Sequence, residues 1–193
     1  MRQQTLVESF ARDPRRARVT KRVHTGPTDG RDPFHGTVVP ENLARPDAPY
    51  GVAWPFGMDE RVGGLHDAPN PGELLCGALA ACADGTVRMI ANRLGIELEQ
   101  LEVEVTGEVD VRGALAVNPS VRAGFQRLRL DVRLRATSST PGARLRQLAA
   151  AADRLCIVLD TLRAGVAVET VFATDAGEAR ADEPLRPGSR ARR

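Results

Sequence analysis

The sequence contains little of what several classes of protein require. Aromatic residues make up 4% of the chain, Lys21 is its only lysine, and it has three cysteines. Three cysteines are too few for a disulfide-stapled secreted domain and do not have the spacing of a tetrahedral zinc site. There is no run of about 18 apolar residues, and the first 24 residues lack the apolar stretch of a signal peptide. These absences predict a cytoplasmic protein without a membrane span.

The length and the charge pattern predict one folded domain between two polar ends. A chain of 193 residues with 42% hydrophobic content is long enough to bury a core. The first 24 residues carry seven basic and two acidic side chains, a local charge of +5, whereas residues 25–174 sum to −4. We therefore expect a flexible basic arm over 1–16 and a folded domain over 17–173. Residues 174–193, rich in Ala, Pro, Gly, Arg and acids, are expected to be disordered.

The basic arm does not have the pattern of a nucleic-acid interface. Residues 12–22 hold six basic side chains but no aromatic residue on which a base would stack, and the folded domain is acidic. A solvated arm explains these charges, and so does a strand whose arginines pair with the acidic domain. Neither a nucleic-acid partner nor a membrane partner is expected.

Periodicity becomes clear after the first third of the chain. The pattern predicts a helix over 71–94, alternating strands over 101–111 and 125–136, a second helix over 141–163, and a last strand over 166–172. The two alternating strands are expected to pair as an antiparallel ribbon. Residues 18–24 and 36–40 have strand composition, and the aperiodic segment 40–70 is expected to lie against a partner subunit. Together these elements predict an α+β fold.

Two cysteines occupy equivalent places, Cys82 on the apolar stripe of the first helix and Cys156 on that of the second. Free cysteine is a small, often buried hydrophobe, so both have a simple packing interpretation. Their helical neighbours are mostly alanines, which allow two helices to approach closely. We therefore expect the two thiols to lie within a few ångströms of each other at a small pocket, and Cys76 to be a separate core residue.

The segment Asn70-Pro71-Gly72-Glu73-Leu74-Leu75-Cys76-Gly77-Ala78-Leu79-Ala80-Ala81-Cys82 resembles the signature of the OsmC/Ohr family. The elements that follow have the order of that family: a long hairpin, a helix with the second cysteine, and the strand Gly165-Val166-Ala167-Val168. The resemblance covers about residues 60–173.

The resemblance implies an OsmC-like fold, in which antiparallel sheets pack on two central Cys-bearing helices, and an intertwined homodimer. It also implies thiol-dependent reduction of organic hydroperoxides in oxidative-stress defence, without a metal or organic cofactor. Cys82 matches the peroxidatic position and Cys156 the resolving position. An external dithiol would reduce the disulfide that they form.

The family's hydroperoxide reductases activate the first cysteine with an Arg from the N-terminal region, held by a Glu at the head of the Cys helix. Arg31 is the nearest candidate, and Arg45 and Arg61 are rivals that the sequence does not rank. Glu73 is the candidate acid, one residue later than in the hydroperoxide-specific branch. An acid that interacts with the helix dipole explains Glu73 equally well.

Ile157 stands where the peroxidase branches commonly have Pro, so Cys156 is expected mid-helix, with Asp153 and Asp160 one turn to either side. Two carboxylates there would raise the pKa of the Cys156 thiol. These departures keep an alternative open, an OsmC-fold dimer that binds a small apolar ligand without redox turnover.

Loop residues His66 and Asp67 are expected to be solvated. His66, Cys76 and Cys82 lack the compact spacing of a metal site.

Overall fold

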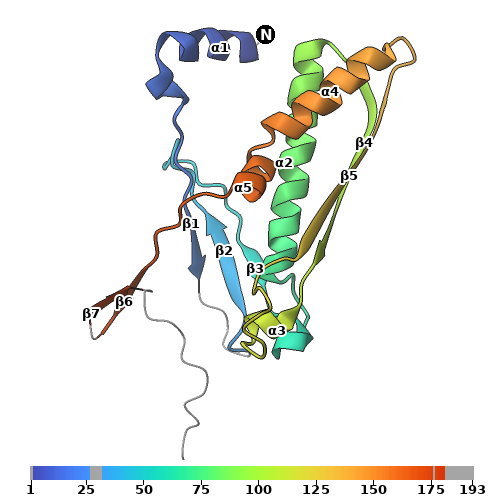
Figure 1. Ribbon diagram of the computed structural model, residues 1–193. Helices are drawn as coiled ribbons and strands as arrows, with labels where there is room; N and C mark the ends of the chain where they lie inside the picture. The colour runs from blue at the N-terminus through green and yellow to red at the C-terminus, as the bar shows by residue number, and fades with distance from the viewer. Residues whose placement is uncertain (1, 27–31, 176, 181–193) are drawn as a thin grey trace, which may run out of the picture.

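The centre of the protein is one long helix covered on two sides (Figure 1). The computed structural model describes residues 2–26, 32–175 and 177–180. Helix α2 (Pro71–Leu94) lies between a two-stranded ribbon, β4 (Leu98–Glu108) and β5 (Arg127–Ala136), and the helices α4 (Gly142–Leu155) and α5 (Ile157–Ala164). The short helix α3 (Val111–Ala114) interrupts the connection between the two strands.

Helix α2 has the bounds that the sequence predicts, because both of its ends carry strong local signals. Asn70 is the N-cap residue: its side chain accepts from the main-chain N–H of Glu73 (3.0 Å), whose carboxylate accepts from the N–H of Asn70 (2.8 Å). Gly95 ends the helix in the left-handed conformation, with φ of 62°. By length and composition α2 could cross a membrane. Its packing against β4, α4 and α5 accounts for the same composition as that of a core helix.

The predicted ribbon is confirmed. β4 and β5 pair antiparallel, with Val103 opposite Val132. Alternation places the apolar side chains of both strands toward α2, where Leu101 and Leu134 pack on the core. Charged side chains occupy the other face and form cross-strand ion pairs, such as that of Glu99 with Arg135 (2.9 Å).

The second helix is not continuous, and here the expectation from the sequence is wrong. Cys156 has an extended backbone (φ −75°, ψ 111°) and serves both as the C-cap of α4 and as the N-cap of α5. No Pro or Gly marks this break, so local sequence signals did not reveal it. The consequence is that a helix N-terminus begins directly after Cys156.

The N-terminal third forms a separate small sheet. The sheet consists of strands β1 (Val23–Gly26), β2 (Gly36–Pro40) and β3 (Trp54–Phe56). Helix α1 (Arg2–Arg12) and the 3-10 turn η1 (Pro14–Ala17) precede it, and the 3-10 turn η2 (Glu60–Val62) follows it. The strands pair antiparallel in the order β1-β2-β3. The sequence predicts a flexible arm over 1–16, whereas the structure has helix α1 in that segment. The sheet stands apart from the layer of α2, β4 and β5 (Figure 1).

The last predicted strand begins later than expected. Val166 and Val168 lie outside any strand and are exposed, and β6 (Val171–Thr174) pairs only with β7 (Gly177–Arg180) among the described residues. A strand requires a hydrogen-bonded neighbour, and residues 166–170 have none in the described part of the chain. Most of the tail expected to be disordered lies outside the described residues.

Replacing Leu148 with alanine is expected to lower the free energy of unfolding by about 2–5 kcal/mol, because the change leaves a cavity in a packed site. Leu148 on α4 has 0% of its surface exposed and packs with Val87 and Ile90 of α2. Urea unfolding followed by circular dichroism measures the loss. Ala149, its exposed neighbour, provides the control: Ala149→Ser is expected to change the value by less than about 0.5 kcal/mol.

Candidate thiol site

The structure brings Cys82 of α2 to the junction between α4 and α5. The Cys82 and Cys156 thiols lie close enough for each to shift the pKa of the other, and both belong to one apolar cluster with Leu79 and Leu159. Cys156 is buried, with 1% of its surface exposed, whereas Cys82 is half-buried. Both thiols are free. The structure therefore places the two free thiols in one cluster.

Cys82 accepts hydrogen bonds from the first turn of α5. The main-chain N–H of Val158 lies 3.5 Å from the Cys82 Sγ. The first N–H groups of a helix have no acceptor within the helix and carry its positive dipole end, so they favour an anion. Burial raises the pKa of the Cys82 thiol, but the N–H groups of Val158 and Ile157 and the thiol of Cys156 lower it. The net direction is downward, toward the reactive thiolate.

Cys156 has the opposite tendency. Burial raises the pKa of its thiol; the N–H of Leu159 lowers it, and the neighbouring Cys82 raises it again. The net pKa is raised, so Cys156 is the weaker acid of the two thiols. The pair therefore consists of one thiol that ionises readily and one that does not.

Thr86 is a polar member of this site that sequence reasoning did not single out as functional. Its hydroxyl donates to the main-chain oxygen of Cys82 (2.7 Å) and lowers the pKa of both thiols. Thr86 is buried on α2, one turn after Cys82. A lone threonine in an alanine- and leucine-rich stripe is the signal that could have identified it.

The acids expected to disturb Cys156 do not do so. Asp153 forms a two-pronged ion pair with Arg163 (2.8 and 2.9 Å). Neither Asp153 nor Asp160 contributes to the raised pKa of Cys156, whose largest cause is burial. The concern raised by the sequence about two carboxylates is therefore wrong.

The candidate activating groups are placed unevenly. Arg31 lies outside the described residues. Glu73 is exposed and engaged in the N-terminal capping box of α2. Arg61 is bonded through its main chain to Asp59, and Arg45 through its main chain to Asn42. Within the described part of the chain, hydrogen bonds and not an arginine lower the pKa of Cys82.

Two cavities lie beside helix α2. Cys76 lines one of them, and the cluster that contains Cys82 and Cys156 lies beside the other. One of about 790 Å³ is lined by Glu73, Arg61 and Cys76. Burial, and then the charge of Glu73, raise the pKa of the Cys76 thiol. Cys76 is thus remote from the thiol pair, as expected, and unfavourable for ionisation.

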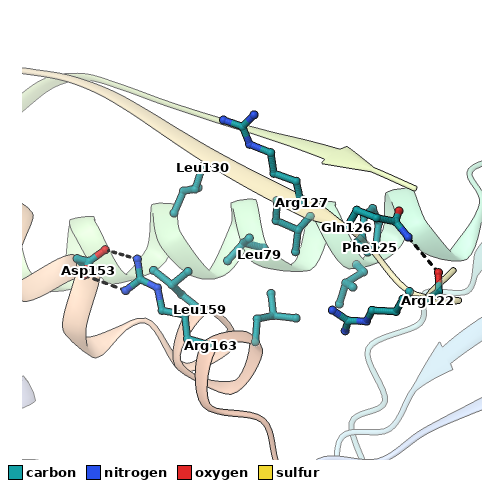
Figure 2. A pocket seen from close by; sticks show the side chains of 13 residues that line it. Leu79, Arg122, Phe125, Gln126, Arg127, Leu130, Asp153, Leu159 and Arg163 are labelled. Carbon is teal, nitrogen blue, oxygen red and sulfur yellow. Dashed lines mark hydrogen bonds and ion pairs between the residues drawn. The ribbon is translucent and has the colours of Figure 1, made fainter. Parts of the chain in front are cut away.

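The second cavity, of about 510 Å³, lies beside the thiol cluster. Figure 2 shows its apolar side chains from α2, β5 and α5, among them Leu79, Leu130 and Leu159. Arg122 lies toward one end, and the Arg163–Asp153 pair lies at the other. Leu79 and Leu159 line this space and also pack in the cluster that contains Cys82 and Cys156.

Replacing Ile157 with proline is expected to preserve the fold and to raise the free energy of unfolding by about 0.4–1 kcal/mol. Residue 157 is the first of α5, where Pro is favoured, and Cys156 already has the extended ψ that a residue before Pro prefers. The change removes one N–H that lowers the pKa of Cys82, so that pKa should rise modestly. Urea unfolding and the pH dependence of thiol alkylation measure the two effects.

Ile157→Ala is the matched control, because it removes the same exposed side chain and keeps the N–H. A proline variant that is less stable than the alanine variant would contradict the observed junction geometry.

Comparison with known proteins supplies the context for this site. A family model described as OsmC-like protein matches residues 64–171, more than half of the chain. No curated protein sequence matches the chain.

Solved structures share the fold at low sequence identity. An OsmC-like protein from Mycoplasma pneumoniae is 15% identical, with a TM-score of 0.56 over 77% of this chain and 89% of that chain. An organic hydroperoxide resistance protein OsmC from Legionella pneumophila is 21% identical (TM-score 0.51; 75% and 90% covered). An organic hydroperoxide resistance protein from Elizabethkingia anophelis is 17% identical (TM-score 0.52; 77% and 91% covered). These likenesses confirm the expected α+β architecture of antiparallel sheets and helices.

Proposed function

The chain belongs to the OsmC-like protein family, and we propose that it reduces organic hydroperoxides with the thiols of Cys82 and Cys156. The observation that carries the proposal is the pair of neighbouring thiols at the start of α5, where the N–H of Val158 donates to Cys82 and where the pKa of Cys82 is lowered and that of Cys156 is raised. The names of two structural neighbours, organic hydroperoxide resistance proteins, support a role in redox chemistry or stress.

The first half of the cycle uses the Cys82 thiolate. Its sulfur attacks the outer oxygen of the hydroperoxide, the O–O bond breaks, and the alkoxide leaves and takes a proton to become an alcohol. Cys82 is thereby oxidised to a sulfenic acid. The N–H groups of Val158 and Ile157 hold the thiolate before the attack, and the apolar cavity beside Leu79 and Leu159 accepts the organic part of the substrate.

The second half uses the thiol that is kept protonated. The sulfur of Cys156 attacks the sulfenic sulfur of Cys82, the hydroxyl leaves as water, and a disulfide forms. An external dithiol then reduces this disulfide. In sum, one hydroperoxide and one dithiol give one alcohol, one water and one oxidised dithiol, and the cycle requires no metal or organic cofactor.

Arg31 and Glu73 remain part of the proposal with different roles. Arg31 is proposed as the arginine that activates Cys82, the role that the family resemblance implies, with Arg45 and Arg61 as its rivals. Glu73 is proposed to hold that arginine through the carboxylate oxygen that the capping box leaves free, since Asn70 engages only one of the two oxygens. Among the described residues, the main-chain N–H groups of Val158 and Ile157 lower the pKa of Cys82, and Glu73 is not a cause of that shift.

We also propose that the protein functions as an intertwined homodimer in the cytoplasm. Large apolar side chains such as Trp54, Val166 and Val168 are exposed in the single chain. A second copy would cover them, and light scattering at micromolar concentration would detect the dimer.

Hydroperoxide consumption by the full chain tests the proposal. With dithiothreitol as reductant, cumene hydroperoxide should be consumed faster than hydrogen peroxide, because Leu79, Leu130 and Leu159 in the cavity beside the thiol cluster can pack against an organic group. Because the pKa of Cys82 is lowered, the rate should rise with pH and level off below the ordinary thiol range. Peptide mass mapping after one equivalent of peroxide should join Cys82 to Cys156.

A turnover equal to that of the Cys82→Ser protein would overturn the proposal. It would favour instead an OsmC-fold dimer that binds a small apolar ligand without redox turnover, for which the cavity beside Leu79 would be the binding site.

A further inference from the structure

Helix α1 is amphipathic, a property that the composition of the arm does not reveal. At 100° per residue, Leu6, Val7 and Phe10 fall on one side of α1, and Thr5 and Glu8 fall on the other. Leu6 is 50% exposed and Val7 is 43% exposed. Phe10 is half-buried, so Leu6 and Val7 form the open part of the apolar side of α1.

A dense group of cations directly follows this apolar stripe. Six basic side chains lie between residues 12 and 22: Arg12, Arg15, Arg16, Arg18, Lys21 and Arg22. Arg15 pairs with its neighbour Asp13, and Arg22 pairs with Glu41. The side chains of Arg16, Arg18 and Lys21 are exposed and form no ion pair with any described residue. The positive charge of the segment is consequently not neutralised within the described chain.

This segment lies apart from the thiol domain. The family match begins at residue 64, well after α1. A hydrogen bond connects α1 to the central layer: the side-chain amide of Asn92, near the end of α2, donates to the side-chain oxygen of Gln3 (3.5 Å). Figure 1 shows α1 beside that end of α2 and away from the sheet of β1, β2 and β3.

From these features we infer that α1 and the cations of residues 12–22 form a docking surface for an anionic lipid bilayer. An interfacial helix inserts its apolar side among the acyl chains, and adjacent basic residues are attracted to anionic headgroups. Leu6, Val7 and Phe10 supply the first interaction, and the unpaired cations supply the second. This inference replaces the expectation of no membrane partner, which concerned a spanning segment.

A lipid surface fits the observations better than a nucleic acid. Both would attract the cations, but a nucleic acid gives no reason for two exposed aliphatic side chains next to them. Residues 12–22 also contain no aromatic side chain on which a base would stack. Organic hydroperoxides with apolar chains partition into bilayers, so docking would bring the thiol site to them. This last link alone rests on the proposed function.

Sedimentation of the full chain with lipid vesicles tests the inference. Vesicles with about one third phosphatidylglycerol should bind the protein at least about tenfold more tightly than pure phosphatidylcholine vesicles at low salt. Because the attraction is screened, binding should fall steeply at high salt. Equal binding to both kinds of vesicle, or none to either, would overturn the inference.

Three variants separate the two interactions. Arg16→Glu with Arg18→Glu should abolish the preference for anionic vesicles, and Leu6→Ser with Val7→Ser should weaken binding to them at least about fivefold. Arg146→Glu with Arg154→Glu is the control, because it makes the same charge change at exposed positions of α4. Circular dichroism verifies that each variant is folded.

Equal losses in the arm and control variants would overturn the inference, because net charge alone would then explain binding. Unchanged binding of the Leu6/Val7 variant would overturn the interfacial helix. Arm-dependent binding to duplex DNA without binding to vesicles would assign the surface to nucleic acid instead.

Discussion

Replacing Cys82 with serine is expected to lower hydroperoxide consumption by at least about a thousand-fold, because a serine hydroxyl is not ionised at neutral pH and cannot replace the thiolate. The substitution removes only the sulfur, so the packing of α2 against α5 should persist. Coupled consumption of a dithiol measures the steady state, and rapid mixing with one equivalent of cumene hydroperoxide measures the first turnover. Both should fall together.

Cys76→Ser is the matched control, since it makes the same chemical change two turns earlier on α2. Cys76 lies beside Gly107 and lines the cavity of about 790 Å³, to whose lining neither Cys82 nor Cys156 belongs. Because burial and Glu73 raise the pKa of its thiol, it contributes little thiolate at neutral pH. The control should retain activity within about twofold. Comparable losses in both variants would show that the site is wrongly assigned.

The elements that the sequence predicted correctly are those with strong periodic or capping signals. The start of α2 is marked by Asn70 and Pro71, and its end by Gly95. Near-strict alternation of apolar and polar residues defines the ribbon of β4 and β5. The proximity of the two cysteine positions followed from small neighbours on both helices. In each case the local preference of the residues agrees with the tertiary arrangement, which is the condition under which a sequence is readable.

The break at Cys156 was not predictable, because it depends on an interaction between distant residues. Ile157 has no helix-breaking property, yet the chain leaves the helical conformation one residue before it. The interruption directs free N–H groups of α5 at the sulfur of Cys82. Main-chain donors have no signature in the sequence. A search of the sequence for an activating arginine therefore does not find the N–H groups that lower the pKa of Cys82.

The N-terminal arm shows a further limit of composition. Counting charges over residues 1–24 predicted a polar arm, and the cations are indeed exposed. The helical spacing that gathers Leu6, Val7 and Phe10 on one side becomes visible only when α1 is known to be a helix. A stripe of three residues is too short to be distinguished from chance in a sequence.

Replacing Cys156 with serine is expected to separate the two halves of the cycle. Serine conserves a hydrogen-bond donor next to Cys82, so the pKa of Cys82 should stay low and the first turnover should remain within a few-fold of the native rate. The sulfenic acid of Cys82 then has no thiol neighbour to attack it and should persist. A 1,3-diketone trapping reagent followed by mass spectrometry would detect it, whereas the native protein should give an internal disulfide instead.

Cys156→Val distinguishes the resolving role from the electrostatic one. Valine removes the attacking sulfur and also the donor to Cys82, so the pKa of Cys82 should rise and the pH profile of the first turnover should move upward. The serine variant should leave that profile in place. Steady-state turnover with a dithiol should fall at least about tenfold in both variants, because the external thiol must then reduce the sulfenic acid directly. An unchanged steady state in the serine variant would show that Cys156 only packs beside Cys82, and the two-cysteine cycle would be wrong.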